Sequence, residues 1–200
     1  MRCVCWRSDV WSRSVWARRA AALTLVPMLL WAQEAIPTFG TTVYSNIGFT
    51  GEVYLLQPGT PRLPKFDKLK PRGSIYTNSL NIPLQDFREG FPGVTNRYEW
   101  FAINYAATFW IQNAAEYRFS LTSDDGSRLY IDGHEVINND GVHPAITRTG
   151  RRRLKQGAHS IRVSYMQGPA MHVALVLEIA GPGEDFHVFD ARNFRPVPGR

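Results

Sequence analysis

The sequence predicts an all-β protein, an antiparallel β-sandwich or barrel, and three observations lead to this fold class. Apolar and polar residues alternate along short segments, for example at 117–121, 161–165 and 173–179, as in half-buried strands. Residue pairs that end in glycine separate these segments, which is typical of tight turns: 125–126, 132–133, 140–141 and 156–157. Helical periodicity is hard to find anywhere in the chain, so long helices are not expected.

The same patterns place the individual elements. Strands are expected at 51–56, 73–76, 117–121, 129–131, 161–165 and 173–179, with an aromatic-rich central strand or strand pair at 99–111. Residues 85–96 are expected to form a loop or a short helix. In the tail, Phe186, Val188 and Phe189 are apolar enough to pack back on the domain.

The amino-terminal segment has the order of a secretory signal. Residues 1–19 are rich in arginine, and an uncharged apolar run follows at 20–32. This run is shorter than the roughly 20 residues that span a bilayer. We therefore expect a signal peptide with cleavage near Ala32 or Ala35 and a secreted, periplasmic or cell-surface protein. An uncleaved anchor is the alternative, and the leader is the expected link to a membrane.

The remaining chain divides into three parts by composition. An N-terminal segment is expected at 33–50, a β domain at 51–180 and a tail containing Pro and Gly at 181–200. Both cysteines, Cys3 and Cys5, belong to the leader, so the mature domain is expected to have no disulfide and no Cys-ligated zinc site.

The basic charge of the chain belongs mostly to the leader. The net charge is +6, from 23 basic and 17 acidic residues, and the first 32 residues hold five arginines and one aspartate. The rest therefore has 18 basic and 16 acidic residues, a net charge of +2. Nucleic-acid binding needs clustered positive charge on the folded domain, so no nucleic-acid partner is expected. No nucleophile elbow or phosphate loop is present, so no enzymatic activity is expected.

One loop carries the chemistry that the sequence suggests most clearly. Asp124 and Asp125 are adjacent between two expected strands, followed by Gly126. Two such carboxylates repel each other unless a cation or backbone N–H groups compensate them. Oxygen ligands of this kind suit Ca²⁺, and Asn139 and Asp140 are further candidates one hairpin later. Asp-Asp-Gly is also an ordinary tight-turn sequence, and the spacing alone leaves both interpretations open.

Residues 117–133 resemble the PA14 (PA-fourteen) domain, the module named after anthrax protective antigen, and more narrowly its fibro-slime-like bacterial branch. The resemblance extends to residues 99–103, 138–143 and 154–165, and it runs from about residue 51 to 179. It implies a β-sandwich or barrel-like fold.

The resemblance also implies a function. In carbohydrate-binding members, two consecutive aspartates joined by a cis peptide hold Ca²⁺, and sugar hydroxyls complete its coordination. Asp124 and Asp125 match that pair as metal and ligand-binding residues, while Asn139 and Asp140 are further ligand-binding candidates. The expected function is an exported carbohydrate-binding or adhesion module whose partner is a glycan or a cell-surface polysaccharide. The alternative is a structural or protein-interaction domain of the cell envelope, with an envelope protein as partner and without sugar or metal.

Two further features have competing interpretations. Trp100, Trp110 and Tyr130 could stack on sugar rings if exposed, although the two tryptophans are expected to fill the core. Residues 151–153 with Lys155 form a basic cluster. It would suit an anionic polysaccharide or lipid headgroups, or serve as a hairpin edge that discourages aggregation.

Overall fold

The computed structural model describes residues 38–196 and confirms an all-β antiparallel fold. The expected leader and its cleavage site lie outside the described residues. The strands are β1 (Phe49–Leu55), β2 (Gly73–Thr77), β3 (Asn81–Asp86), β4 (Phe101–Ile111), β5 (Ala115–Asp124), β6 (Ser127–Ile131), β7 (His134–Asn139), β8 (Ile146–Leu154), β9 (Gly157–Gln167), β10 (His172–Ala180) and β11 (His187–Val188). Two short 3₁₀ turns, η1 (Phe66–Lys68) and η2 (Ala191–Asn193), complete the described part.

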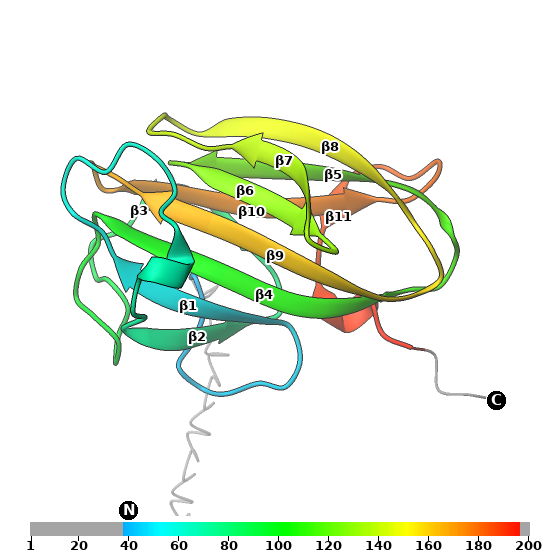
Figure 1. Cartoon of the computed structure of the whole chain (residues 1–200), viewed down its shortest axis with the longest axis horizontal. Coiled ribbons are helices and arrows are strands. Elements are labelled where there is room, and N and C mark those ends of the chain that lie inside the picture. The colour runs from blue at the N-terminus through cyan, green and yellow to red at the C-terminus, as the bar shows by residue number, and fades with distance from the viewer. Residues whose placement is uncertain (1–37, 197–200) are drawn as a thin grey trace, which may run out of the picture. The chain divides into compact units, whose positions relative to one another are not determined.

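The strands form two sheets that face each other as a sandwich (Figure 1). The six-stranded sheet has the order β2-β1-β4-β9-β6-β7, and the five-stranded sheet has the order β11-β10-β5-β8, with β3 also paired to β10. Strands β5 and β6 follow each other in the chain but belong to different sheets. The turn between them therefore crosses from one layer to the other, at the left-hand end of the sandwich in Figure 1.

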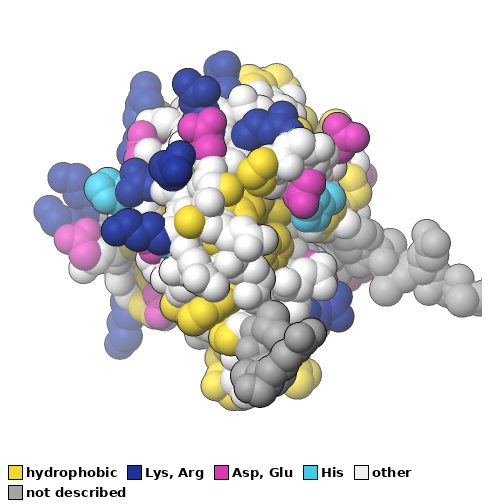
Figure 2. All heavy atoms as spheres, turned by 90° about the vertical axis from the view of Figure 1, so that its right-hand side faces the viewer, with side chains coloured by type: hydrophobic (Ala, Val, Ile, Leu, Met, Phe, Trp, Pro, Cys, Tyr) yellow, Lys and Arg dark blue, Asp and Glu magenta, His cyan; other side chains and the backbone are white. Residues whose placement is uncertain are grey.

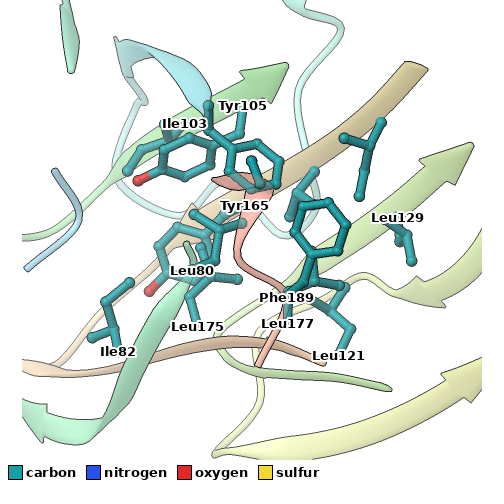
Figure 3. Close-up of a cluster of buried hydrophobic side chains, with 14 of the residues drawn as sticks. Leu80, Ile82, Ile103, Tyr105, Leu121, Leu129, Tyr165, Leu175, Leu177 and Phe189 are labelled. Carbon is teal, nitrogen blue, oxygen red and sulfur yellow. The ribbon is translucent and has the colours of Figure 1, made fainter. Parts of the chain in front are cut away.

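The core lies between the sheets, where the alternating apolar faces meet. Leu121, Leu175 and Leu177 of the five-stranded sheet point toward Tyr105 and Tyr165 of the six-stranded sheet, and all five are fully buried (Figure 3). Because a strand sends alternate side chains to opposite faces, this arrangement confirms the period-two pattern of the sequence.

The tail completes the core at one end. Phe189 is fully buried and packs edge-on against Phe49 and Phe109. Phe186 is 37% exposed and lies under the guanidinium of Arg118 instead. The expectation that the tail packs on the domain is thus confirmed for Phe189, while Phe186 stays at the surface.

The arginine-rich strand β8 is the edge of the five-stranded sheet. Lys and Arg side chains gather in the upper part of Figure 2, the side on which β8 lies in Figure 1. Arg148, Arg151 and Arg153 are all exposed. Charged side chains on an edge strand discourage pairing with another chain, which is one of the two interpretations of the basic cluster.

The stretch 85–96 was expected to be a loop or short helix, and residues 87–96 are indeed a loop, but the first two residues belong to β3, which was not expected. Pro83 obscures this strand, and β3 tolerates it because it pairs with β10 alone, across an irregular register. Trp100 and Trp110 are half-buried and do not belong to the core between the sheets, although Trp100 packs against a smaller buried cluster that includes Ala102 and Met166.

None of the helices among residues 38–196 has the length and apolarity needed to cross a bilayer.

A pair of leucine truncations tests the position of the core. Leu177 is fully buried between the sheets, whereas Leu84 on β3 is 58% exposed. Leu177→Ala should lower the free energy of unfolding by about 2–5 kcal/mol, because it removes buried contacts and leaves a cavity. Leu84→Ala, the control, should change it by less than about 0.5 kcal/mol. Urea denaturation measures both; equal effects would contradict this core.

Candidate functional site

The turn between β5 and β6 holds the two aspartates, and backbone amides from two other loops hold Asp125. The carboxylate of Asp125 is buried, with the residue 3% exposed. Its Oδ1 accepts a hydrogen bond from the His143 amide at 2.9 Å, and its Oδ2 accepts one from the Gly168 amide at 2.7 Å. Asp125 therefore ties together the β5–β6 turn, the β7–β8 loop and the β9–β10 loop. The Asp124–Asp125 peptide bond is cis.

Buried polar side chains of β9 form a hydrogen-bond network with the β5–β6 turn. The Tyr165 hydroxyl lies 2.5 Å from the Asp124 carbonyl oxygen and 2.7 Å from Oε1 of Gln167. The Gln167 amide nitrogen donates in turn to the carbonyl oxygens of Ala170 and His172. Because Tyr165 and Gln167 are fully buried, this network fixes the turn against the β9–β10 loop.

Asn139 joins the same region through a second network. Its side-chain nitrogen donates to Oγ of Ser123 and to the carbonyl oxygen of Ile146, both at 3.0 Å. The hydroxyls of Ser123 and Ser127 lie 2.7 Å apart across the turn. Since the amide nitrogen of Asn139 is engaged, its amide oxygen is the side-chain atom left to serve as a cation ligand.

The surroundings of the turn disfavour the charged forms of both aspartates. Burial raises the pKa of Asp124, the charge of Asp125 raises it further, and the Ala145 amide opposes the rise. Burial also raises the pKa of Asp125, against the hydrogen bonds from Gly168 and His143. Both shifts mean that the charged carboxylates are insufficiently compensated by their surroundings. A cation would supply the missing positive charge, so the donor set fits a hard ion such as Ca²⁺.

The turn offers a small set of protein ligands. Within residues 38–196, no three side chains of the His, Cys, Asp and Glu types gather as a metal cluster. Ca²⁺ takes 6–8 oxygen ligands, so an ion at Asp124 and Asp125 would draw the others from amide or carbonyl oxygens, water or a bound ligand.

Asp140 has partners of its own. Its Oδ1 accepts a hydrogen bond from the Leu63 amide at 2.7 Å, and its Oδ2 forms a 2.8 Å ion pair with Arg128. The Asp140 side chain is 1% exposed. It connects Leu63, in the loop between β1 and β2, to Arg128 of the six-stranded sheet. A ligand-binding role for Asp140 stays a prediction, and it would compete with both partners.

The turn needs Gly126 because another backbone segment lies close to it, and not because of a positive φ. Glycine is favoured in tight turns because it tolerates a positive φ, and Gly133, Gly141 and Gly157 have φ of 75°, 137° and 128°. Gly126 has no such φ, but a Cβ there would lie 2.7 Å from the Gly141 carbonyl oxygen. The two backbones meet so closely that neither loop leaves room for a side chain at Gly126.

Trp100 and Val142 lie beside Gly168, whose amide binds the Asp125 carboxylate, and of these three only Trp100 was considered as a sugar-contacting residue from the sequence. A Cβ on Gly168 would lie 3.2 Å from Oδ2 of Asp125, 3.4 Å from Val142 and 3.7 Å from the Trp100 ring. Val142 is 47% exposed and Trp100 is half-buried. Trp100 has a left-handed backbone, with φ of 53°, and its side chain packs against a small buried cluster separate from the main core. The sequence does not reveal that Trp100 is partly exposed, because its burial depends on the fold.

The fold and this loop define a β-sandwich module of the PA14 class. The family model described as the PA14 domain matches residues 65–184, which is more than half of the chain. The chain therefore belongs to the PA14 domain family. A comparison with curated protein sequences finds no significant match. The narrower fibro-slime-like branch stays a prediction.

Solved structures share the fold at low sequence identity. A PA14 sugar-binding domain from an RTX adhesin is 20% identical with a TM-score of 0.62, over 74% of this chain and 97% of that one. An anti-sigma factor domain-containing protein is 18% identical with a TM-score of 0.59, over 77% of this chain and 51% of that protein, so the chain spans about half its length. The epithelial adhesin 9 A domain from Candida glabrata, in complex with Galβ1-3GlcNAc, is 12% identical with a TM-score of 0.52, over 78% and 92%.

The raised pKa of Asp124 predicts how stability varies with pH when no metal is bound. A raised pKa in the folded state means that the folded protein takes up protons before the unfolded chain as pH falls toward the ordinary value of 3.8. The charged pair thus destabilises the fold at neutral pH, and protonation relieves this. Asp124→Asn, measured in EDTA, should gain stability relative to wild type at about pH 7, and the gain should shrink toward about pH 4.5.

Asp132 provides a control of opposite sign. Burial tends to raise its pKa, but hydrogen bonds from His159 and Ser160 lower it overall. Its charged form therefore stabilises the fold above the ordinary value of 3.8 and stops doing so as pH falls through its lowered pKa. Asp132→Asn should thus destabilise the protein at neutral pH. If the stability difference between Asp124→Asn and wild type is constant with pH, or grows on acidification, the charged aspartates do not destabilise the fold as described.

Proposed function

We propose that this PA14 domain binds carbohydrate at the β5–β6 turn, through a Ca²⁺ held by Asp124 and Asp125. The observation that carries this proposal is the position of two adjacent carboxylates whose pKa values are both raised, in a turn held rigidly by the His143 and Gly168 amides. A rigid site that already holds repelling charges binds a cation without having to order its ligands first.

The residues around the turn suit a sugar. Ca²⁺, when bound, accepts sugar hydroxyls as ligands because it takes more oxygens than the two carboxylates supply. Half-buried Trp100 and exposed Val142 lie beside Gly168, next to the turn, and would offer an apolar surface to one face of a sugar ring. Asn139 would contribute its amide oxygen to the ion or to a hydroxyl.

The comparisons support this class of ligand. One solved PA14 domain is described as sugar-binding, and the epithelial adhesin A domain was solved with a disaccharide. We propose a glycan or cell-surface polysaccharide as partner and an exported location, with the β domain at 51–180 as the binding unit. Catalysis by this domain is not part of the proposal.

Calorimetric titration of the full chain with Ca²⁺ tests the metal site. Wild type should give a saturable heat signal, and Asp124→Ala should abolish it because half of the carboxylate pair is lost. Asp67→Ala is the control, since Asp67 is an exposed acid on η1 and should leave the signal unchanged. No saturable signal from wild type removes the metal claim.

A glycan array read with Ca²⁺ and with EDTA separates sugar binding from the alternative role. Binding that needs Ca²⁺ and is weakened by Trp100→Ala, while Ca²⁺ affinity is retained, supports the proposal. If the protein binds Ca²⁺ but no glycan on the array, the result supports a structural or protein-interaction domain of the cell envelope.

A further inference from the structure

The outer face of the six-stranded sheet carries a shallow groove that is separate from the aspartate turn. Two hollows of about 480 and 580 Å³ lie on this face, and both are lined by Tyr130 and Arg162. None of the residues that line them belongs to the β5–β6 turn. We call the two hollows and the residues between them the outer-face groove.

Strand register places Arg162 at the centre of the groove. In one row across the sheet, Thr50 of β1 is paired with Ala106 of β4, which is paired with Arg162 of β9, which is paired with Tyr130 of β6. Because paired residues of neighbouring strands point to the same face, this row forms a continuous strip. Ala106 is small and exposed, so the strip is open beside the arginine.

The Arg162 guanidinium is held in place but has no counter-ion. Its central carbon lies 3.8 Å from the centroid of the Tyr130 ring, and its Nη1 donates a long hydrogen bond of 3.4 Å to Oγ of Ser164. Within residues 38–196, no carboxylate forms an ion pair with it. Stacking on an aromatic ring orients an arginine and leaves its N–H edge free to bind an anion.

The acids of the same face are already engaged. Glu135 and Asp140 both pair with Arg128, at 3.3 and 2.8 Å. Glu52 accepts a 2.5 Å hydrogen bond from the Tyr54 hydroxyl, and together with burial it raises the pKa of Tyr54 to about 12.

At the rim of the smaller hollow, Lys65 and Asp67 contribute opposite charges. Arg162 lines both hollows and, among residues 38–196, forms no ion pair, so its guanidinium is the group of the groove that is available to bind an anion.

The other lining groups suit the hydroxyls of a sugar. Thr50, Thr108 and Ser160 present hydroxyl groups in the larger hollow, whereas the buried Ser164 hydroxyl beside the smaller hollow is bonded to Arg162 and Asn104. The larger hollow is otherwise lined by small residues, among them Gly48, Ala106 and Gly133. Such a shallow, hydroxyl-lined strip fits an extended chain better than a compact ligand.

We propose that the outer-face groove binds an anionic sugar chain whose carboxylate or sulfate group pairs with Arg162. The site goes beyond the proposed function because it uses neither Ca²⁺ nor the aspartate turn. Duplex DNA and anionic lipid surfaces carry the same kind of charge, and they enter the test as competing ligands.

Calorimetry of the full chain with trigalacturonic acid and with a heparin-derived hexasaccharide tests the proposal. At least one of the two should bind in EDTA, and the fully methyl-esterified trigalacturonate, which lacks the charge, should not bind. Arg162→Met should weaken binding about tenfold, because it removes a charge-assisted hydrogen bond and keeps the apolar stem on Tyr130. Binding of trigalacturonic acid would show that a carboxylate is sufficient, whereas binding of the heparin hexasaccharide alone, which carries both groups, would show that sulfate is needed.

Two further variants make the result specific to the groove. Arg153→Met removes the same charge from the exposed basic cluster on β8 and should change affinity less than about twofold. Ala106→Tyr fills the groove without changing its charge and should weaken binding as much as Arg162→Met. Asp124→Ala should leave binding intact, so failure here is distinguishable from failure of the Ca²⁺ site.

Three results would overturn the proposal. The first is that neither anionic sugar binds to wild type. The second is that Arg153→Met and Arg162→Met weaken binding equally, which would mean attraction to general positive charge. The third is that duplex DNA or phosphatidylserine vesicles displace the sugar and bind more tightly.

Discussion

The described structure depends on one buried carboxylate at its functional end. Asp125 accepts hydrogen bonds from the His143 and Gly168 amides, and these two bonds fix the turn between the two sheets to the loops on either side of it. A carboxylate that is buried this deeply has to be hydrogen-bonded, since an unpartnered charge would cost several kcal/mol. The same bonds leave Asp124 beside it, half-buried and insufficiently compensated. The same pair therefore provides structural support and would provide the proposed cation site.

The sandwich separates two kinds of surface. Its inner faces carry the apolar side chains that meet in the core, which leaves the outer faces free for polar groups. On the six-stranded sheet these outer groups include a network that leads from Arg162 through Ser164 to Asn104. The aspartate turn lies at the end of the sandwich, and the groove lies on its face. One β-sandwich can thus present two sites of different chemistry, one acidic and one basic.

The sequence predicted the strands well because alternation reports directly which side chains face a core. It missed β3, where Pro83 interrupts the pattern, and it also gave no strand for β7 and β8. It placed Trp100 in the core because hydrophobicity alone does not reveal which end of a strand is covered. The aspartate pair could be named from its adjacency and its resemblance to a family. The amides that hold Asp125 could not, because any residue except proline offers an N–H group and only the fold decides which ones converge. The role proposed for Arg162 could not be predicted from the sequence, because its lack of an ion-pair partner depends on which residues lie beside it on the neighbouring strands.

The central claim is that the β5–β6 turn is a preformed cation site. An anomalous difference map from crystals of this protein grown with Ca²⁺ tests it most directly. The account predicts a peak in contact with carboxylate oxygens of both Asp124 and Asp125, with the His143 and Gly168 amides still bonded to Asp125. A map without a peak at the turn, or a peak that forms only after those two amide bonds have broken, would contradict it.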